Sequence, residues 1–196
     1  LWTLLIAFGY IFLKKDIFKL MRIVREPTML AFATASSESA YPKTMEALDK
    51  FGVPKRITSF VLPLGYSFNL DGSMMYMAFA VLFIAQAYNI DLSFSQQALI
   101  LFTLMITSKG IAGVSRASIV VIASTLAMFQ LPEAGILLIL AIDQFLDMGR
   151  TATNVIGNSI ATAVIARTEG NKDELTEQEG IMVNNIPPVN QLADNS

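Results

Sequence analysis

The sequence predicts an all-α integral membrane protein. Two re-entrant helical hairpins, one broken transmembrane helix and one polar-faced transmembrane helix are expected, arranged as an inverted repeat. The first observation is composition: 54% of the 196 residues are hydrophobic and only 15% are charged, with a mean hydropathy of +0.54. Soluble domains usually carry about 25% charged residues. The second observation is that the long apolar runs are interrupted near their middles by short polar or glycine-containing stretches.

Composition also excludes several classes of function. The formal net charge is −2, so no nucleic-acid partner is expected. The chain has no cysteine, which excludes disulfides and thiolate metal sites, and no histidine, the usual general base and zinc ligand. An enzyme is therefore not expected, and no organic cofactor is predicted.

Residues 1–15 are predicted to be the end of a truncated transmembrane helix. The apolar run ends at Lys14 and Lys15, which makes it too short to cross a bilayer of about 30 Å. No basic segment precedes it, unlike in a signal peptide, so we interpret the chain as an internal piece of a longer one.

Residues 16–52 are predicted to form the first hairpin, in which a polar break at 35–42 separates arms at 16–34 and 43–51. Each arm is too short to cross a membrane. Lysine and arginine lie near the start of the hairpin and just past its end, so both ends are expected in the cytoplasm. The tip then lies at membrane depth, surrounded by protein or lining a cavity.

Residues 57–89 are predicted to form the broken helix. The segment is longer than the roughly 20 residues that one crossing needs, and GYSFNLDGS interrupts it at 65–73. Unwound backbone there exposes carbonyls, and Asn69 and Asp71 add side-chain oxygens, which are ligands that suit a hard cation. A simple glycine kink is the alternative, but it leaves the intramembrane Asp71 unexplained.

Residues 95–129 are predicted to form a second hairpin that enters from outside, because the preceding loop, QAYNIDLSFSQQ, has no lysine or arginine. Its glycine-containing tip, 108–116, can expose backbone N–H and C=O groups to a ligand. The last helix is expected at 132–168, with Pro132 in its first turn. Residues 169–196 are polar and are expected to be a disordered cytoplasmic tail.

The last helix carries a polar face between apolar flanks. Six polar residues are spaced so that they share one side of a helix: Asp143, Asp147, Arg150, Thr151, Asn154 and Asn158. Charges at this depth are tolerated when they face an interior or a water-filled path. Arg150 can grip a carboxylate as a planar fork and Asp147 can hold an ammonium, which together suit a carboxylate-bearing zwitterion. The alternative is a structural ion pair between Asp147 and Arg150 at i, i+3.

Hairpin, broken helix, hairpin and polar-faced helix form two similar halves of opposite orientation. An inverted repeat of this kind, with its site near the midplane, is typical of secondary transporters.

Three motifs strengthen this interpretation: NLDGS from Asn69, SKGIAGV from Ser108, and DMGRT from Asp147 with NVIGN from Asn154. They resemble the dicarboxylate/amino acid:cation symporter family, also called the glutamate transporter family, and the likeness extends from about Leu13 to Arg167. The resemblance implies that an acidic amino acid binds between the two hairpin tips of a mobile transport domain. It further implies elevator-type movement, coupling to Na⁺ or H⁺, a bacterial inner-membrane location, and a homotrimer formed through regions outside this chain.

The resemblance also implies roles for individual residues. Arg150 is expected to hold the side-chain carboxylate of the substrate, and Asp147 its α-amino group. The further substrate-contact positions are Thr151, Asn154, Ser36, Ser37, Ser73 and Val114. The cation positions are Gly65, Asn69, Asn154 and Asn158 for one site, the backbone around Ser67, Ser108, Lys109 and Ile111 for a second, and Asn69 with Asp71 for part of a third.

This chain departs from the family pattern at four places. Asn158 stands where sodium-coupled members carry Asp, which weakens sodium binding there and favours protons. Met77 stands where relatives carry Glu or Gln. Glu38 lies within the serine motif of the first tip and is either a proton carrier with a raised pKa or a solvated or arginine-paired side chain. Ser115 and Arg116 replace the more usual Pro-Gly of the second tip.

The predicted function is secondary active symport of L-glutamate or L-aspartate, with H⁺ and Na⁺ both open as coupling ions. A C4-dicarboxylate symporter and an ion channel that uses the same polar path are the alternatives.

Overall fold

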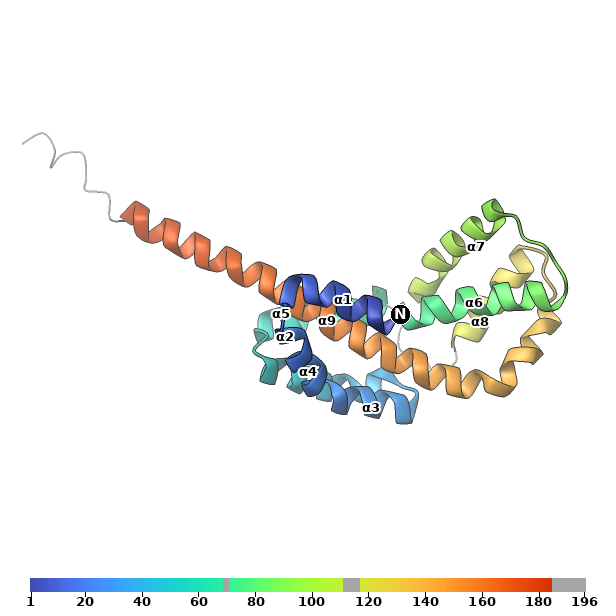
Figure 1. Ribbon diagram of the computed structural model, residues 1–196, viewed down its shortest axis with the longest axis horizontal. Helices are drawn as coiled ribbons and strands as arrows, with labels where there is room; N and C mark the ends of the chain where they lie inside the picture. The colour runs from blue at the N-terminus through green and yellow to red at the C-terminus, as the bar shows by residue number, and fades with distance from the viewer. Residues whose placement is uncertain (69–70, 111–116, 185–196) are drawn as a thin grey trace, which may run out of the picture.

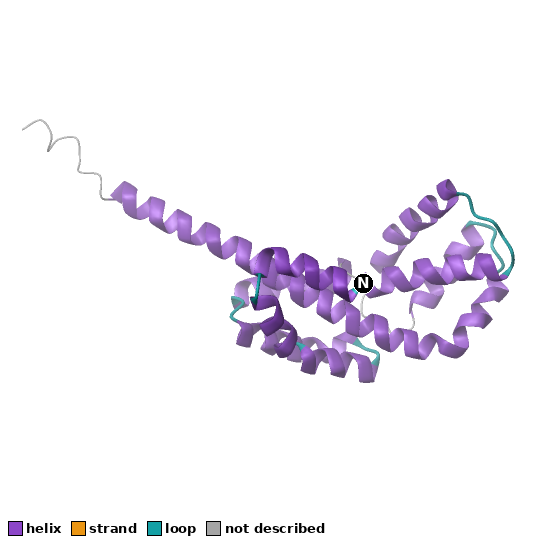
Figure 2. Cartoon of the chain, in the orientation of Figure 1, coloured by secondary structure: helices purple, strands orange, loops and turns teal. Residues whose placement is uncertain are grey.

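The computed structural model describes residues 1–68, 71–110 and 117–184, of which 110 and 170–184 are described by their backbone alone. This part of the chain is entirely helical (Figures 1 and 2), as the sequence predicted. The elements are α1 (Trp2–Leu13), α2 (Asp16–Ile23), α3 (Arg25–Thr34), α4 (Ser37–Phe51), α5 (Lys55–Phe68), α6 (Asp71–Ala87), α7 (Phe94–Thr107), the 3₁₀ turn η1 (Ser108–Gly110), α8 (Ala117–Met128), the 3₁₀ turn η2 (Glu133–Gly135) and α9 (Ile136–Asn184).

Helix α9 is the element around which the others pack. It runs the length of the described molecule, with α1–α5 around its middle and α6–α8 around its N-terminal part (Figure 1). Every residue from 151 to 160 is buried. Burial on all sides over almost three turns requires neighbours around the whole helix, which α1, α3, α4, α5 and α6 supply.

Two buried apolar clusters divide the molecule. The first joins α1, α2, α4 and α5 to the middle of α9, where Ile156 and Ile160 contribute. The second joins α6, α7 and α8 to the start of α9, where Ile139 contributes. Each cluster therefore contains one segment of the predicted broken helix, and the polar face of α9 lies between the two.

The first predicted hairpin differs from expectation at its tip. The predicted polar break at 35–42 is only two residues wide, because α4 already begins at Ser37 and includes Pro42. Ala35 adopts a left-handed conformation (φ 49°), and the Ser36 side chain caps α4 by accepting the N–H of Ser39. A serine cap starts a helix, and we had interpreted the serines as part of a loop.

The described part of the predicted interruption at 65–73 is helical. The described backbone is helical up to Phe68 and again from Asp71, so Gly65, Ser67 and Ser73 all lie in helices. Residues 69–70, including Asn69, lie outside the described residues. Within the described chain, Lys55–Ala87, a stretch of 33 residues that contains this gap, is the one that is long and apolar enough to cross a membrane.

Helix α9 continues beyond its expected end. We predicted a disordered tail from 169, but the helix extends to Asn184. Four of the 16 residues over 169–184 are Glu, which favours helix, and the first proline after it is Pro187.

The surface carries many exposed large apolar side chains. Phe60 and Phe145 are each 71% exposed and Phe79 is 63% exposed. Soluble monomers rarely expose apolar area on this scale, so this surface needs lipid or another protein against it.

Glycine permits close contact between α6 and α9. A Cβ added at Gly72 would lie 2.4 Å from the backbone oxygen of Arg150 and 2.9 Å from Cβ of Thr153. Backbone atoms of a helix cannot move aside as a flexible side chain can. The start of α6 can therefore lie this close to the polar face of α9 only because Gly72 has no side chain.

Replacing Gly72 with alanine should destabilise the fold by about 1–3 kcal/mol, because α6 must move away from α9. The measurement is thermal stability of the detergent-purified protein. Gly149→Ala is the matched control, since a Cβ at Gly149 meets nothing within 4 Å. Equal stability of the two variants would contradict this account of the α6–α9 contact.

Candidate functional site

The polar face predicted for α9 is buried. All six of its residues are at most 7% exposed: Asp143, Asp147, Arg150, Thr151, Asn154 and Asn158. Their spacing places them on successive turns of one helix face, opposite α6 and α5. Carboxylates, a guanidinium and amides are therefore held together away from water.

Arg150 and Asp147 form a buried ion pair. The Oδ1 atom of Asp147 lies 2.8 Å from Nε and 2.6 Å from Nη2 of Arg150, and Thr151 Oγ1 donates to the same oxygen at 3.3 Å. The predicted alternative, an i, i+3 ion pair, is thus present. Burying such a pair often costs as much as the attraction returns, so stability alone does not explain its position.

The rest of the guanidinium is directed toward hydroxyl groups of two other helices. Nη1 of Arg150 donates to Ser118 Oγ on α8 and, at 3.4 Å, to Ser73 Oγ on α6. The predicted substrate residue Ser73 therefore lies in the site. Ser118 was not predicted, although a polar residue in the first turn after the second tip was a usable signal.

A second carboxylate extends the polar cluster toward the start of α9. Tyr76 Oη donates to Asp143 Oδ1 at 2.6 Å, and the Arg150 guanidinium lies 5.6 Å from the Tyr76 ring centroid. Asp143 is fully buried. The sequence placed Asp143 on the polar face without a role, and Tyr76 was not predicted, although it shares a face of α6 with Ser73 at i, i+3.

Asn154 binds the backbone of α6 from another helix. Its Oδ1 atom accepts the backbone N–H of Gly72 at 2.8 Å and of Ser73 at 3.4 Å, while Nδ2 donates to Ser73 Oγ at 3.0 Å. Both N–H groups lie in the first described turn of α6, beside Arg150, where such donors favour an anion.

The tip of the first hairpin is organised by local hydrogen bonds. Ser36 caps α4, and Ser39 Oγ donates to the Ser36 carbonyl at 2.8 Å. Ser37 is buried. Glu38 is exposed in the first turn of α4. Ser115 and Arg116 of the second tip lie outside the described residues.

The predicted cation positions are brought together only in part. Asn158 lies against Gly65, where an added Cβ would sit 2.5 Å from Asn158 Oδ1. Asp71 and Ser67 are half-buried on either side of residues 69–70, and Ser108 is buried. Asn69 and Ile111, and the substrate position Val114, lie outside the described residues.

Lys109 makes a contact through its side chain, whereas a role was predicted only for its backbone. Its Nζ atom donates to the carbonyl oxygen of Phe68, the last residue of α5, at 2.6 Å. A charged group therefore links the start of the second hairpin tip to the end of α5.

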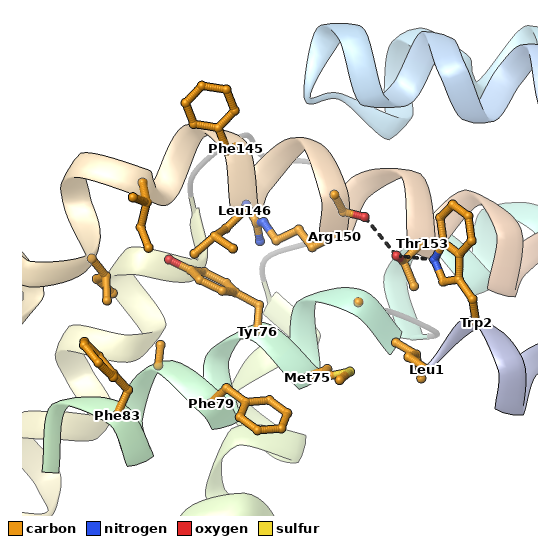
Figure 3. Close-up of a pocket in the computed structure, with 15 residues that line it drawn as sticks. Leu1, Trp2, Met75, Tyr76, Phe79, Phe83, Phe145, Leu146, Arg150 and Thr153 are labelled. Atoms are coloured by element: carbon orange, nitrogen blue, oxygen red, sulfur yellow. Dashed lines mark hydrogen bonds between the residues drawn. The ribbon is translucent and has the colours of Figure 1, made fainter. Parts of the chain in front are cut away.

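A cavity of about 600 Å³ lies beside the site, between α6 and α9 (Figure 3). At one end Trp2 Nε1 donates to Thr153 Oγ1 at 2.8 Å, while Tyr76 and Arg150 form part of its wall. Most of the remaining lining is aliphatic or aromatic, including Phe79, Phe83 and Phe145. Such walls cannot satisfy two carboxylates, so we do not assign the substrate to this cavity.

A known protein family and several curated proteins match most of this chain. The model of the sodium:dicarboxylate symporter family matches residues 1–168. The chain is 52% identical over 159 residues to a proton/sodium-glutamate symport protein of Bacillus caldotenax and 51% identical over 150 residues to a proton/glutamate-aspartate symporter of Escherichia coli K12. It is 41% identical over 162 residues to a C4-dicarboxylate transport protein of Bacillus subtilis 168.

These alignments cover 81%, 76% and 82% of the chain, but only 38%, 34% and 38% of the respective relatives. The chain thus spans little more than a third of their length. The family and these relatives are transporters by name and not enzymes. With a match over 168 of its 196 residues, the chain belongs to the sodium:dicarboxylate symporter family.

Proposed function

We propose that this chain is most of the transport domain of a secondary active symporter for L-glutamate and L-aspartate, coupled to H⁺ and/or Na⁺. The observation that carries the proposal is the buried Arg150. Its guanidinium is directed at hydroxyl groups of α6 and α8 and lies beside the N-terminus of α6. A distal carboxylate can replace those hydroxyls and gain a charge-assisted, bidentate contact.

Charge supports coupling to a cation. Asp143, Asp147 and Arg150 carry a formal charge of −1 together, because two carboxylates face one guanidinium. An acidic amino acid adds another negative charge, since its two carboxylates outnumber its ammonium group. Burying this excess at membrane depth is costly unless cations enter with the substrate.

The membrane arrangement belongs to the same proposal. We place α2–α4 and α7–α8 as re-entrant hairpins, α5–α6 as the broken transmembrane helix and α9 as the polar-faced one, related by an inverted repeat. The substrate binds between the hairpin tips and moves with the domain in an elevator-type cycle. The full-length protein is a homotrimer of the bacterial inner membrane, assembled through regions outside this chain, with its C-terminus in the cytoplasm.

C4-dicarboxylate transport is the second candidate, and relatives with that name support it. Arg150 would serve either substrate. Asp147 favours an amino acid, because its carboxylate lies beside Arg150 where an α-ammonium can pair with it, whereas a dicarboxylate brings no cation.

The full-length protein in proteoliposomes should accumulate glutamate and aspartate against a gradient when a proton or sodium gradient is imposed, because cations must offset the negative charge. Radiolabelled uptake with each gradient, both and neither is the measurement. Uptake that only equilibrates would indicate a channel. Accumulation of malate without glutamate would select the dicarboxylate alternative.

Arg150→Ala should lower uptake of acidic substrates by at least about 30-fold, because the buried carboxylate loses its charged partner. Arg150→Lys keeps the charge but not the fork, and should also be impaired. Arg167→Ala is the control: Arg167 is exposed, 3.9 Å from Asp16, and its loss should change little. Normal glutamate uptake by well-folded Arg150→Ala protein would show that the substrate carboxylate binds elsewhere.

A further inference from the structure

A cleft of about 300 Å³ lies where α9 leaves the helices packed around it (Figure 1). Its lining comes from residues 13–19, 51–54 and 163–167, so the turn between α1 and α2, the link between α4 and α5, and one face of α9 meet there. We call it the basic cleft. Its volume is at the lower end of the range for ligand pockets.

The basic cleft has an apolar floor and a charged rim. Leu13 and Val53 are each 3% exposed and form part of the floor. Lys19 and Arg167 line the same cleft but are exposed, and Lys19 Nζ lies 5.8 Å from the centroid of the Phe51 ring. These walls suit an anion that carries a hydrocarbon part, because the anion can reach the cations while carbon atoms cover the floor.

The charge around the basic cleft is strongly positive. Among the lining residues and their neighbours within two positions in sequence, seven are basic and three are acidic. An excess of four positive charges favours an anion at this end of the molecule. The basic residues are Lys14, Lys15, Lys19, Lys50, Lys55, Arg56 and Arg167, and the acidic ones are Asp16, Asp49 and Glu169.

The opposite end of the molecule is charged differently. The loops at 88–93 and 129–135 contain no lysine or arginine, and their charged residues are Asp91 and Glu133. Because lysine and arginine collect on the cytoplasmic side of membrane proteins, the basic cleft lies at the cytoplasmic leaflet in the membrane arrangement proposed above. Basic clusters beside membrane-spanning helices attract the anionic phospholipids of that leaflet.

Asp16 is the acidic residue on the rim, and its contact leaves Arg167 available to another anion. Asp16 Oδ2 lies 3.9 Å from Arg167 Nη1, and both side chains are more than half exposed. Exposed pairs at this separation contribute little. A phosphate can accept two hydrogen bonds from a guanidinium, so it can replace the aspartate as the partner of Arg167.

We propose that the basic cleft binds the headgroup of an anionic phospholipid, with Lys19 and Arg167 contacting its phosphate. The inference rests on the membrane arrangement proposed above and not on the substrate or the coupling ion. Ala163 in the cleft is 13 residues beyond Arg150 on α9, about 20 Å at the rise of an α-helix. Glutamate uptake in a fixed lipid mixture should therefore not depend on the two lipid-contacting residues.

The test is the thermal stability of the full-length protein in a neutral detergent, titrated with phosphatidylglycerol, with phosphatidylcholine, or with inorganic phosphate at constant sodium concentration. We expect only phosphatidylglycerol to stabilise the wild type. Lys19→Gln and Arg167→Gln should each weaken its apparent affinity about fivefold, because each removes one basic side chain near the headgroup. Asp16→Asn should strengthen the affinity, because it removes the carboxylate that competes for Arg167.

Lys43→Gln is the matched control. Lys43 is also exposed, but it pairs with Glu26 and does not line the cleft, so phosphatidylglycerol should bind this variant as it binds the wild type. Equal losses of affinity in Lys43→Gln and Lys19→Gln would overturn the proposal, since diffuse surface charge would then be sufficient.

Other outcomes would contradict the proposal as directly. Equal stabilisation by phosphatidylcholine would show that the charge of the headgroup is not recognised, and stabilisation by inorganic phosphate would assign the cleft to a free anion. If Lys19→Gln and Arg167→Gln are not recovered folded, Asp16→Asn decides, and an unchanged affinity in that variant overturns the proposal.

Uptake measurements separate this inference from the proposed function. A protein that responds to phosphatidylglycerol but does not accumulate glutamate would contradict the proposed function alone. A protein that accumulates glutamate while its stability ignores phosphatidylglycerol would contradict the lipid site alone.

Discussion

Burial of the Arg150 charge is the constraint on which the rest of the structure depends. A guanidinium that is at most 7% exposed requires acceptors on every side, and they come from three helices: Asp147 on α9, Ser73 on α6 and Ser118 on α8. Helices α6 and α8 must therefore both approach α9 at the level of Arg150. Gly72 makes the approach possible for α6, since any side chain there would collide with the backbone of Arg150. The two apolar clusters on either side hold the helices in place but leave this central level polar.

Side chains from distant parts of the chain contact the backbone on both sides of residues 69–70. Asn154 of α9 accepts the N–H groups of Gly72 and Ser73, and Lys109 of η1 donates to the carbonyl oxygen of Phe68. Tertiary contacts therefore hold the described end of α5 and the first described turn of α6 against the rest of the molecule. The N–H groups lie beside Arg150, so this part of the site favours an anion.

The sequence was sufficient for the helical class and for the polar face of α9, because both depend on periodicity along one helix. All six residues of that face are buried as expected. The contacts between helices were harder to predict from the sequence. Tyr76 and Ser118 meet the cluster through packing of α6 and α8, and their local sequence gives only a weak signal: a face shared with Ser73 and a polar residue just after the second tip. The sequence-based prediction was wrong in two places. Ser36 is a helix cap at the first tip, where a loop was predicted. Residues 169–184 are polar but continue α9, because polarity does not prevent a helix from forming.

Asn158 and the charges of the polar face bear together on the proposed coupling. Asn158 places a neutral amide against Gly65, where the family resemblance implies a carboxylate in sodium-coupled members. Under the proposed function, an amide at this position would attract Na⁺ less than a carboxylate. Asp143, Asp147 and Arg150 carry a formal charge of −1 together, and an acidic substrate would add another negative charge. Under the same proposal that charge has to be balanced during transport, and a proton can do so without a further cation site built of oxygen ligands.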